Sequence, residues 1–481
     1  MHHPMFTKAA FATALLCAFA SQAQAGGFQL TEQSALSMGR AYAGAGVDGQ
    51  DISGVYYNPA SMTLDQGTRF QFGTIVADLD LAYESSKLEG YPGKNDNGRA
   101  ATTPIPFAYA AHQLNDTVQL GLAITAPFGL ETEFGDNWDQ AFRGISSELQ
   151  AVDINPSIAF KLSDKFSIGF GVSAQYANAN LKYNLAQIAN WKLGKLAAAQ
   201  KQPSINGNSQ PSPIPAPQKQ AGIDGILKSL GKDPQLKVHV KDWAWGWNVG
   251  MLWKPVDTVR VGLTYRSAVS HTAKGDAEIN GLKGLEMPPE LMKQLAPFAK
   301  EHGFNAAALP GLLATGKTGA AISMDAPAWA MLSASWDINP TYTWSGMVRW
   351  TNWSTFKSLD LQFTDLGHTT KQPTDWRDTW FISTGLDAHI NDKLTVRGGI
   401  GYEIGVIQNP ATRSGAIPDA NRIWFTAGTS YKFTKNLKAD FSAAYVRGVG
   451  ERGIYDDDGE RIGRFKNLNG VLLGAQVQYR F

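Results

Sequence analysis

The chain has 481 residues, and its 43 lysines and arginines balance 42 aspartates and glutamates, which leaves a formal net charge of +1. Because there is no basic excess, nucleic acid is not an expected partner. Aromatic residues make up 11% of the chain, with 14 Trp and 49 Gly, and this composition suits either a membrane β-barrel or a large secreted β-protein.

Residues 1–25 have the pattern of a cleavable secretory signal. Lys8 precedes an apolar run over 9–20, and Ala23-Gln24-Ala25 provides an A-x-A cleavage site. The apolar run is shorter than the roughly 18 residues that a membrane anchor needs. We therefore expect the mature chain to begin at Gly26.

The only cysteine, Cys17, lies inside this segment. Leu16 is bulkier than the residue expected before a lipidated cysteine, so a lipoprotein is disfavoured. The mature protein is expected to have no disulfide, no thiolate metal site and no cysteine nucleophile. We expect no cofactor.

Beyond residue 25 no apolar run is long enough for a transmembrane helix, but several segments alternate apolar and polar residues, which predicts β-strands. The clearest cover 166–177, 259–266, 394–403, 437–445 and 471–481. In a soluble sandwich the apolar face would meet a core, whereas in a membrane barrel it meets lipid and the charged face lines the lumen. The terminal Phe481 resembles the final aromatic residue by which outer-membrane proteins are recognised for insertion.

Aromatic residues near the predicted strand ends favour the barrel, because interfacial girdles need them there. These residues are Trp243, Trp245, Trp247, Trp253, Tyr342, Trp344 and Trp350. The charged positions that would then face the lumen are Arg260, Arg266, Arg397, Glu403, Lys438 and Asp440.

Short polar turns alternate with long loops, which is the asymmetry of an outer-membrane barrel. Turns are expected at 115–116, 163–165, 255–257, 339–340, 391–392 and 434–436. Loops are expected at 85–103, 129–150, 184–237, 274–318, 357–373, 407–420 and 450–462. These connections join about fourteen strands, an even number, as single-chain barrels require. The predicted fold class is therefore all-β, a transmembrane antiparallel barrel.

Two of the loops contain apolar stretches that are typical of short amphipathic helices. These stretches cover 185–196, 223–230, 285–298 and 306–313, and a Pro-, Ser- and Gln-rich segment lies at 202–220. Such helices either pack on one another or form an apolar groove that receives a hydrophobic ligand. The sequence leaves both alternatives open.

Three motifs hint at other chemistry, and each is weak. Residues 44–49 fit the G-x-G-x-x-G pattern of a dinucleotide site, but no buried strand precedes them. Residues 456–460 are acidic but lack the spacing of a calcium loop. His389 lacks the nucleophile elbow that an esterase needs. We therefore expect neither a metal site nor an enzyme.

Several motifs, in order along nearly the whole mature chain, resemble the FadL family of outer-membrane transporters of long-chain fatty acids and other hydrophobic compounds. They are Gly27–Glu32, Gly39–Gly46, Tyr57–Ala60, Phe128–Phe134, Trp245–Gly250, Leu263–Ser267 and Ile417–Arg422. The resemblance implies a plug at 26–67 that closes the lumen and a barrel at 68–481 with long extracellular loops. It also implies a monomer in the bacterial outer membrane, surrounded by membrane lipid and lipopolysaccharide.

The resemblance also assigns roles by position. Ligand would pass from an apolar groove between the large loops to a luminal site near the mature N-terminus, and would leave sideways where the third strand kinks. Pro127, Phe128 and Gly129 would form this kink, because proline lacks a backbone donor and glycine lacks bulk. Asn58, Pro59 and Ala60 would anchor the plug. The implied ligand-binding residues are Phe28, Lys182, Tyr183, Gly250, Lys371 and Glu403.

Two positions depart from the family pattern. Members that bind fatty acids use basic side chains for the carboxylate, but the aligned positions here are Tyr183 and Gln372, with Lys182 and Lys371 one residue away. A shift of one residue reverses the direction of a strand side chain, so the lysines either face the ligand or point outward. Fatty acids are the first expected ligand, and neutral hydrophobic compounds such as aromatic hydrocarbons are the alternative. A general pore or an adhesin is the rival function.

Overall fold

The computed structural model describes residues 27–88, 93–96, 98, 103–136, 138–139, 141, 144–184, 235–280, 283, 305–413, 418–456 and 459–481. The expected signal at 1–25, the segment at 202–220 and the expected loop helices at 185–196, 223–230 and 285–298 lie outside these residues.

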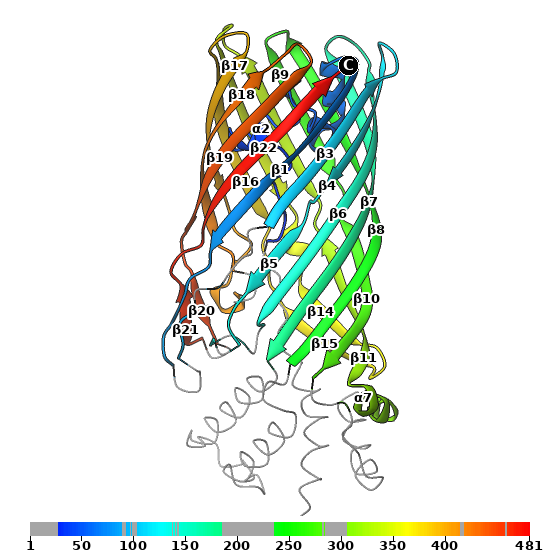
Figure 1. Ribbon diagram of the computed structural model, residues 1–481, viewed down its shortest axis with the longest axis vertical. Helices are drawn as coiled ribbons and strands as arrows, with labels where there is room; N and C mark the ends of the chain where they lie inside the picture. Colours follow the sequence, from blue (N-terminus) through cyan, green and yellow to red (C-terminus); the bar gives the residue numbers. More distant parts are fainter. Residues whose placement is uncertain are drawn as a thin grey trace, which may run out of the picture.

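Long antiparallel strands form a closed barrel (Figure 1). β1 (Thr68–Asp80) closes the cylinder by pairing with the last strand, β22 (Asn469–Arg480). The others are β3 (Thr103–Gln113), β4 (Val118–Thr125), β5 (Gly129–Glu133), β6 (Ser146–Lys161), β7 (Phe166–Asn184), β8 (Gln235–Val256), β9 (Val259–Arg266), β10 (Val269–Ile279), β11 (Lys317–Ala326), β12 (Trp329–Asp337), β13 (Tyr342–Thr351), β14 (Ser358–Phe363), β15 (His368–Pro373), β16 (Thr379–His389), β17 (Leu394–Glu403), β18 (Asn421–Lys432) and β19 (Leu437–Val449). Five consecutive pairs, β4/β5, β9/β10, β11/β12, β13/β14 and β15/β16, each continue one strand. The described residues therefore make 14 barrel strands, which confirms the predicted fold class.

The predicted turns join consecutive strands at one end of the barrel, called the turn end below (Figure 1). The third turn begins two residues later than predicted, because Pro255 and Val256 continue β8. At the opposite end, the loop end, the predicted loop at 357–373 is wrong, since β14 and β15 form a hairpin there. The loops predicted at 129–150 and 274–318 are too long, because β5, β6 and β10 occupy parts of them.

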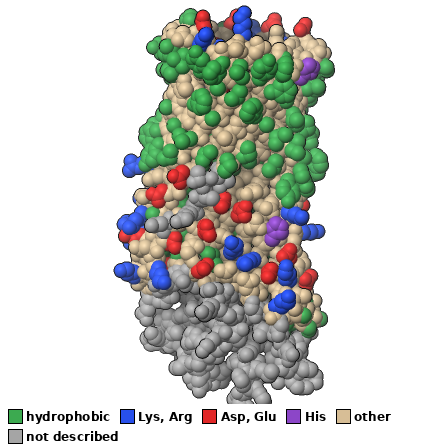
Figure 2. Space-filling view, in the orientation of Figure 1, with side chains coloured by type: hydrophobic (Ala, Val, Ile, Leu, Met, Phe, Trp, Pro, Cys, Tyr) green, Lys and Arg blue, Asp and Glu red, His purple; other side chains and the backbone are tan. Residues whose placement is uncertain are grey.

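Near the turn end, the strands direct apolar side chains outward and polar side chains inward, as predicted. Phe72, Phe170 and Leu473 are 64%, 46% and 59% exposed, whereas Asp440 and Gln476 are buried. Figure 2 shows the outward hydrophobic side chains as a broad band around this part of the barrel. An apolar outer face with a polar interior is the arrangement that surrounding lipid requires.

Near the loop end the alternation is reversed. On β8 the outward residues change from Trp243 to the exposed Lys241, while Val238 and Val240 are buried inside. On β14 the buried residues are Leu359, Leu361 and Phe363. The barrel thus continues past the apolar band as a cylinder with a polar outside and an apolar inside. Lipid-facing alternation does not describe such segments, and this explains the overlong predicted loops.

The same reversal corrects the prediction for the tryptophans of β8. Trp243, Trp245 and Trp247 lie in the middle of β8 and not at its end, and they are 56%, 70% and 50% exposed. They mark where the apolar band ends. Trp253, by contrast, lies near the end of β8, and Tyr342 begins β13.

The described residues that precede β1 fold inside the barrel (Figure 1). They contain helix α2 (Ala35–Met38), helix α3 (Gly54–Tyr57) and the 3-10 helix η1 (Pro59–Leu64). The Ser34 side chain caps α2 by accepting a hydrogen bond from the Ser37 amide. Residues 31–47 and 51–62 are buried, so this segment fills the lumen at the turn end.

At the loop end, β2 (Tyr83–Ser85), β20 (Gly453–Tyr455) and β21 (Arg461–Phe465) form a second, small sheet. The other helices are η2 (Ala306–Ala308), α7 (Leu309–Thr315), η3 (Trp353–Thr355) and η4 (Pro410–Thr412). η2 and α7 together cover the helix expected at 306–313 and continue it to Thr315, and Leu309, Leu312 and Leu313 are buried in the apolar interior. Among the described residues, none of the helices is long and apolar enough to span a membrane.

Candidate functional site

The third strand of the barrel is broken between β4 and β5. The break covers Ala126 to Phe128, and Pro127 within it has no amide hydrogen to donate to a sheet. β3 pairs with β1 over 103–112 but with β4 only over 108–113. β5 pairs with β6 alone. The half of β3 that does not pair with β4 therefore has no described partner on that side. The barrel wall is unpaired between this half of β3 and β5.

The start of the plug supplies hydrogen-bond partners for this break. The Leu30 amide donates to the Pro127 carbonyl at 2.8 Å, and the Gly129 amide donates to the Phe28 carbonyl at 3.0 Å. The Gln33 side-chain amide donates to the Ala126 carbonyl at 2.7 Å. The start of the plug is thus hydrogen-bonded to the kinked strand.

A cavity of about 510 Å³ lies at the break, within the size range of small-molecule sites. Its lining includes residues from the inner face of the wall, Ile105, Phe128, Leu149 and Trp424. Its lining also includes residues that are exposed on the outer face, Pro104, Pro106, Gln150 and Val152. A single cavity lined from both faces is an opening through the wall, and we call it the lateral opening.

Charged side chains stand at the inner end of the lateral opening. Arg422 lies 2.5 Å from Asp419 and 3.4 Å from Glu403, and the Trp424 indole donates to Glu403 at 3.2 Å. Glu403 thus faces inward, as expected. Glu32 of the plug also lines the cavity, and its burial, together with the nearby Glu403 carboxylate, raises its pKa from 4.5 to about 7.

Phe28 lies in a box of aromatic rings next to the kink. Its ring centroid is 4.9 Å from Trp353, 5.8 Å from Phe128, 6.2 Å from Phe356 and 6.3 Å from Trp376. Most of these contacts are edge-to-face, a favourable geometry for aromatic pairs. The side chain is 2% exposed.

A second, much smaller cavity of about 50 Å³ lies further toward the loop end, beside Tyr183. Its lining is mainly apolar and includes Val240, Ala273, Ile322 and Met324. Leu130, Glu148 and Leu149 line both this cavity and the lateral opening. The two spaces are thus neighbours that share part of their walls.

The two lysines expected in the ligand site lie elsewhere. Lys182 is exposed on the outer face of β7, next to the buried, inward Tyr183. The Lys371 side chain is 71% exposed and lies 3.3 Å from Asp360 on β14. Gln372 pairs with Leu359 through the strand register. We therefore correct the expected ligand-binding set by leaving out Lys182 and Lys371.

Asn58 bonds the plug to strand β8. Its side-chain amide donates to the Met251 carbonyl at 3.0 Å, and its carbonyl oxygen accepts from the Ala60 amide at 3.1 Å. A Cβ at Gly250 would collide with the Asn58 side chain, so only glycine allows this approach. Gly250 lies under the plug and not in the ligand cavity where we expected it.

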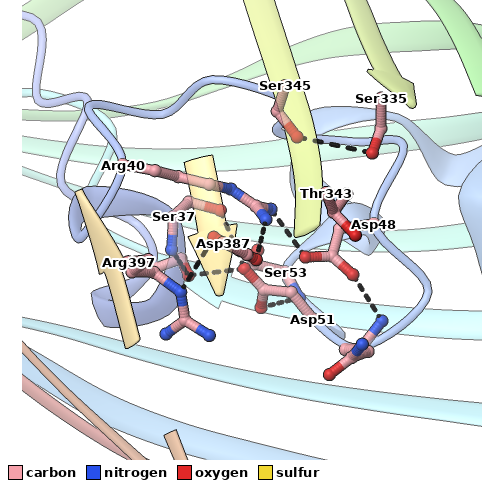
Figure 3. A network of polar contacts seen from close by, with 12 residues as sticks. Ser37, Arg40, Asp48, Asp51, Ser53, Ser335, Thr343, Ser345, Asp387 and Arg397 are labelled. Carbon is pink, nitrogen blue, oxygen red and sulfur yellow. Dashed lines mark hydrogen bonds and ion pairs between the residues drawn. The ribbon is translucent and has the colours of Figure 1, made fainter. Parts of the chain in front are cut away.

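A buried ion network joins the plug to the barrel wall, and the sequence analysis missed it (Figure 3). Arg40 of the plug lies 2.6 Å from Asp48 and 2.8 Å from Asp387 on β16. Asp387 is also 3.3 Å from Arg397 on β17, which donates to Ser430 at 2.7 Å. The sequence offered two signals for this network, since buried charges need partners. One was the inward arginine of β17, and the other was an arginine in the first buried segment.

Two of the rejected motifs have structural roles. Gly44 and Gly46 have positive φ angles of 71° and 75° in turns of the plug. The His389 ring contacts Thr343 and Thr395 at 3.2 and 3.1 Å. No group of three or more potential metal ligands occurs within the described ranges.

A lipid-facing barrel with a bonded internal plug and an opening in its wall is the architecture of a plugged outer-membrane transport barrel. The sequence model of the family described as outer membrane protein transport protein (OMPP1/FadL/TodX) matches residues 16–481. The chain belongs to this family. It is therefore an outer-membrane β-barrel protein of a transport family.

Individual relatives agree with this assignment. The long-chain fatty acid transport protein of Escherichia coli (strain K12) is 30% identical over 452 residues, which cover 92% of each chain. The outer membrane protein P1 of Haemophilus influenzae (strain ATCC 51907 / DSM 11121 / KW20 / Rd) is 27% identical and covers 92% of this chain and 90% of its own. The solved structure of a Pseudomonas aeruginosa FadL homologue has a TM-score of 0.72 at 24% identity, over 95% of this chain and 100% of that one. That of the P. putida toluene transporter TodX has a TM-score of 0.66 at 16% identity, over 94% and 99%.

Proposed function

We propose that the protein takes up long-chain fatty acids through the outer membrane. Ligand is captured in an extracellular apolar groove, moves to a luminal site beside Phe28 and leaves sideways through the lateral opening at Pro127, Phe128 and Gly129. The observation that carries the proposal is the cavity of about 510 Å³ that is lined from both faces of the wall. Residues 26–67 serve as the plug, and residues 68–481 as a barrel that works as a monomer.

The route is favourable for an acyl chain. Each buried methylene contributes about 0.8 kcal/mol, so a sixteen-carbon tail gains on the order of 10 kcal/mol in a dry site. Phe28, Phe128, Tyr183 and Leu149 belong to one buried apolar cluster at the loop end. From this cluster the ligand passes Leu149 into the lateral opening and then meets the acyl chains of the bilayer, so it need not displace the plug.

Two relationships support fatty acids as the cargo. The Escherichia coli relative, named as a long-chain fatty acid transport protein, is similar over 92% of both chains. Arg422 brings a cation to the inner end of the lateral opening, where a carboxylate headgroup would pass. Asp419 and Glu403 are the acidic residues that hold this arginine.

Import of neutral hydrophobic compounds is the second candidate, and the direction of the lysines favours it. Lys182 and Lys371 are exposed on the outside of the barrel. Among the described lining residues of the small cavity beside Tyr183 there is no lysine or arginine. A carboxylate in that cavity would lack a cationic partner, whereas an uncharged ring would need none.

Uptake by bacterial cells that lack their own fatty acid transporter tests both candidates. Cells that express the protein should take up labelled oleate faster than cells with the empty vector, and planar bilayers that contain it should show no steady large current. Faster toluene uptake without faster oleate uptake would support the neutral-compound candidate. A steady large single-channel current would contradict both and favour a general pore.

A further inference from the structure

Four lysines lie on the outer face of the barrel just beyond the apolar band. Lys182 is on β7, Lys237 and Lys241 are on β8, and Lys274 is on β10, and all four side chains are exposed. The strand register places Lys182 directly opposite Lys237, and Lys241 directly opposite Lys274. The two pairs are four residues apart on β8, or about 14 Å at ~3.4 Å per residue.

Like charges that face each other across neighbouring strands are unfavourable in an isolated sheet. Within the described part of the chain, none of these four lysines forms an ion pair with a carboxylate. The acidic residues of the same surface have other partners or positions. Glu148 accepts hydrogen bonds from Asn180 and Gln150 at 3.0 and 2.9 Å. Glu278 lies opposite Lys237 in the strand register, but its carboxylate is 3.5 Å from Lys317, and Asp276 lies opposite His239. A bound anion would stabilise both lysine pairs.

The membrane boundary lies directly next to the inner lysine pair. Trp243 follows Lys241 by two residues on the same face of β8, is 56% exposed and packs against Tyr176 at 5.3 Å. Aromatic residues of this kind sit at the level of lipid headgroups. Figure 2 shows that charged side chains, both basic and acidic, begin just beyond the hydrophobic band. Because the turn end is periplasmic in such barrels, this boundary belongs to the outer leaflet.

We propose that these four lysines bind the phosphates of lipopolysaccharide in the outer leaflet. The outer leaflet of a bacterial outer membrane consists mainly of this glycolipid, and its lipid A disaccharide carries a phosphate at each end. Two lysine pairs therefore match two phosphates, and the acyl chains of the lipid lie against the tryptophans of β8. Asn178 lies in the same register row as Lys241 and Gln150, and supplies an amide donor for the sugar.

The site is next to the lateral opening. Gln150, which lines that opening, is two strands from Lys241 in one register row, or about 10 Å at the usual strand spacing. A lipid held by the lysines would therefore lie beside the place where cargo meets the bilayer. This role goes beyond the proposed transport function and does not depend on which cargo is carried.

Titration of the full-length protein in detergent with lipid A tests the proposal, with bound lipid counted by native mass spectrometry. Bisphosphorylated lipid A should bind more tightly than lipid A from which both phosphates have been removed. The double variant Lys241→Gln/Lys274→Gln should bind bisphosphorylated lipid A about 25-fold more weakly, since each lysine near an anionic headgroup contributes about fivefold. The matched control is Lys432→Gln/Lys435→Gln, which changes two exposed lysines at the turn end and should bind like the unmodified protein.

Three outcomes would overturn the proposal. The first is equal binding of phosphorylated and dephosphorylated lipid A by the unmodified protein, a comparison that requires no variant to fold. The second is unchanged affinity of the Lys241/Lys274 variant at an unchanged thermal unfolding midpoint. The third is equally tight binding of phosphatidylglycerol, which would indicate a general anionic surface and not a lipopolysaccharide site.

Discussion

Replacing Gly129 by tryptophan should close the lateral opening and stop uptake. A Cβ built on Gly129 lies 2.8 Å from the Leu30 side chain and 3.7 Å from the Leu149 carbonyl, and all three residues line the cavity. A larger side chain at this position therefore extends into the passage. A buried indole removes about 150–250 Å² from water, and at about 25 cal/mol per Å² its displacement costs about 4–6 kcal/mol.

This cost predicts that passage through the opening slows by about a thousandfold or more, since each 1.4 kcal/mol is a factor of ten. Oleate uptake by cells with Gly129→Trp should fall to the level of the empty vector. Gly129→Ala, which only displaces the flexible end of Leu30, should retain uptake, and so should Leu162→Trp, a tryptophan at an exposed turn position. Normal uptake by correctly inserted Gly129→Trp protein would refute lateral exit.

Three further changes test the plug and its attachments. Arg40→Ala leaves buried Asp387 without its plug partner at a cost of about 3–5 kcal/mol. Brief channel openings in planar bilayers should therefore become at least a hundredfold more frequent. The control Arg260→Ala, which breaks a more exposed pair in the wall, should not change their frequency. Because burial raises the pKa of Glu32 from 4.5 to about 7, the docked segment holds a proton that the undocked segment releases, and docking should weaken as the pH rises from about 4.5 through 7. Hydrogen exchange at 27–33 should report this trend, and Glu32→Gln should abolish it; an identical trend in the variant would contradict the assignment. Gly250→Ala should lift the plug and make it sensitive to protease, whereas Gly398→Ala, where the nearest atom to the new methyl group is 3.6 Å away, should not.

The family and the barrel could be predicted from the sequence because both depend on local patterns. Alternation of apolar and polar residues follows from the direction of successive strand side chains, and it correctly placed Asp440 and Arg397 inside. The family resemblance placed a kink at Pro127, Phe128 and Gly129, and the strand is interrupted at Ala126 to Phe128, since proline and glycine act on their own strand. These features need no knowledge of what lies across the barrel.

The candidate site was less accessible, because it combines residues that are distant in the sequence. A shift of one residue in the alignment decides whether Lys182 or Tyr183 faces inward. The sequence left that shift open, and only the register of β7 with β8 resolved it. The network of Arg40 with Asp387 was missed because nothing local in either segment points to the other. Gly250 was assigned to the ligand, although its neighbour is Asn58 of the plug.

The sequence by itself therefore determined that the chain alternates between two environments, and hence that it forms a lipid-facing barrel of about fourteen strands. It could not determine where along each strand those environments change. Only the tertiary structure located the reversal at Trp243, beyond which apolar residues face inward, because the strands share one cylinder that leaves the membrane at a common level. That reversal creates the apolar interior at the loop end and sets the lysine pairs of β7, β8 and β10 at the membrane boundary.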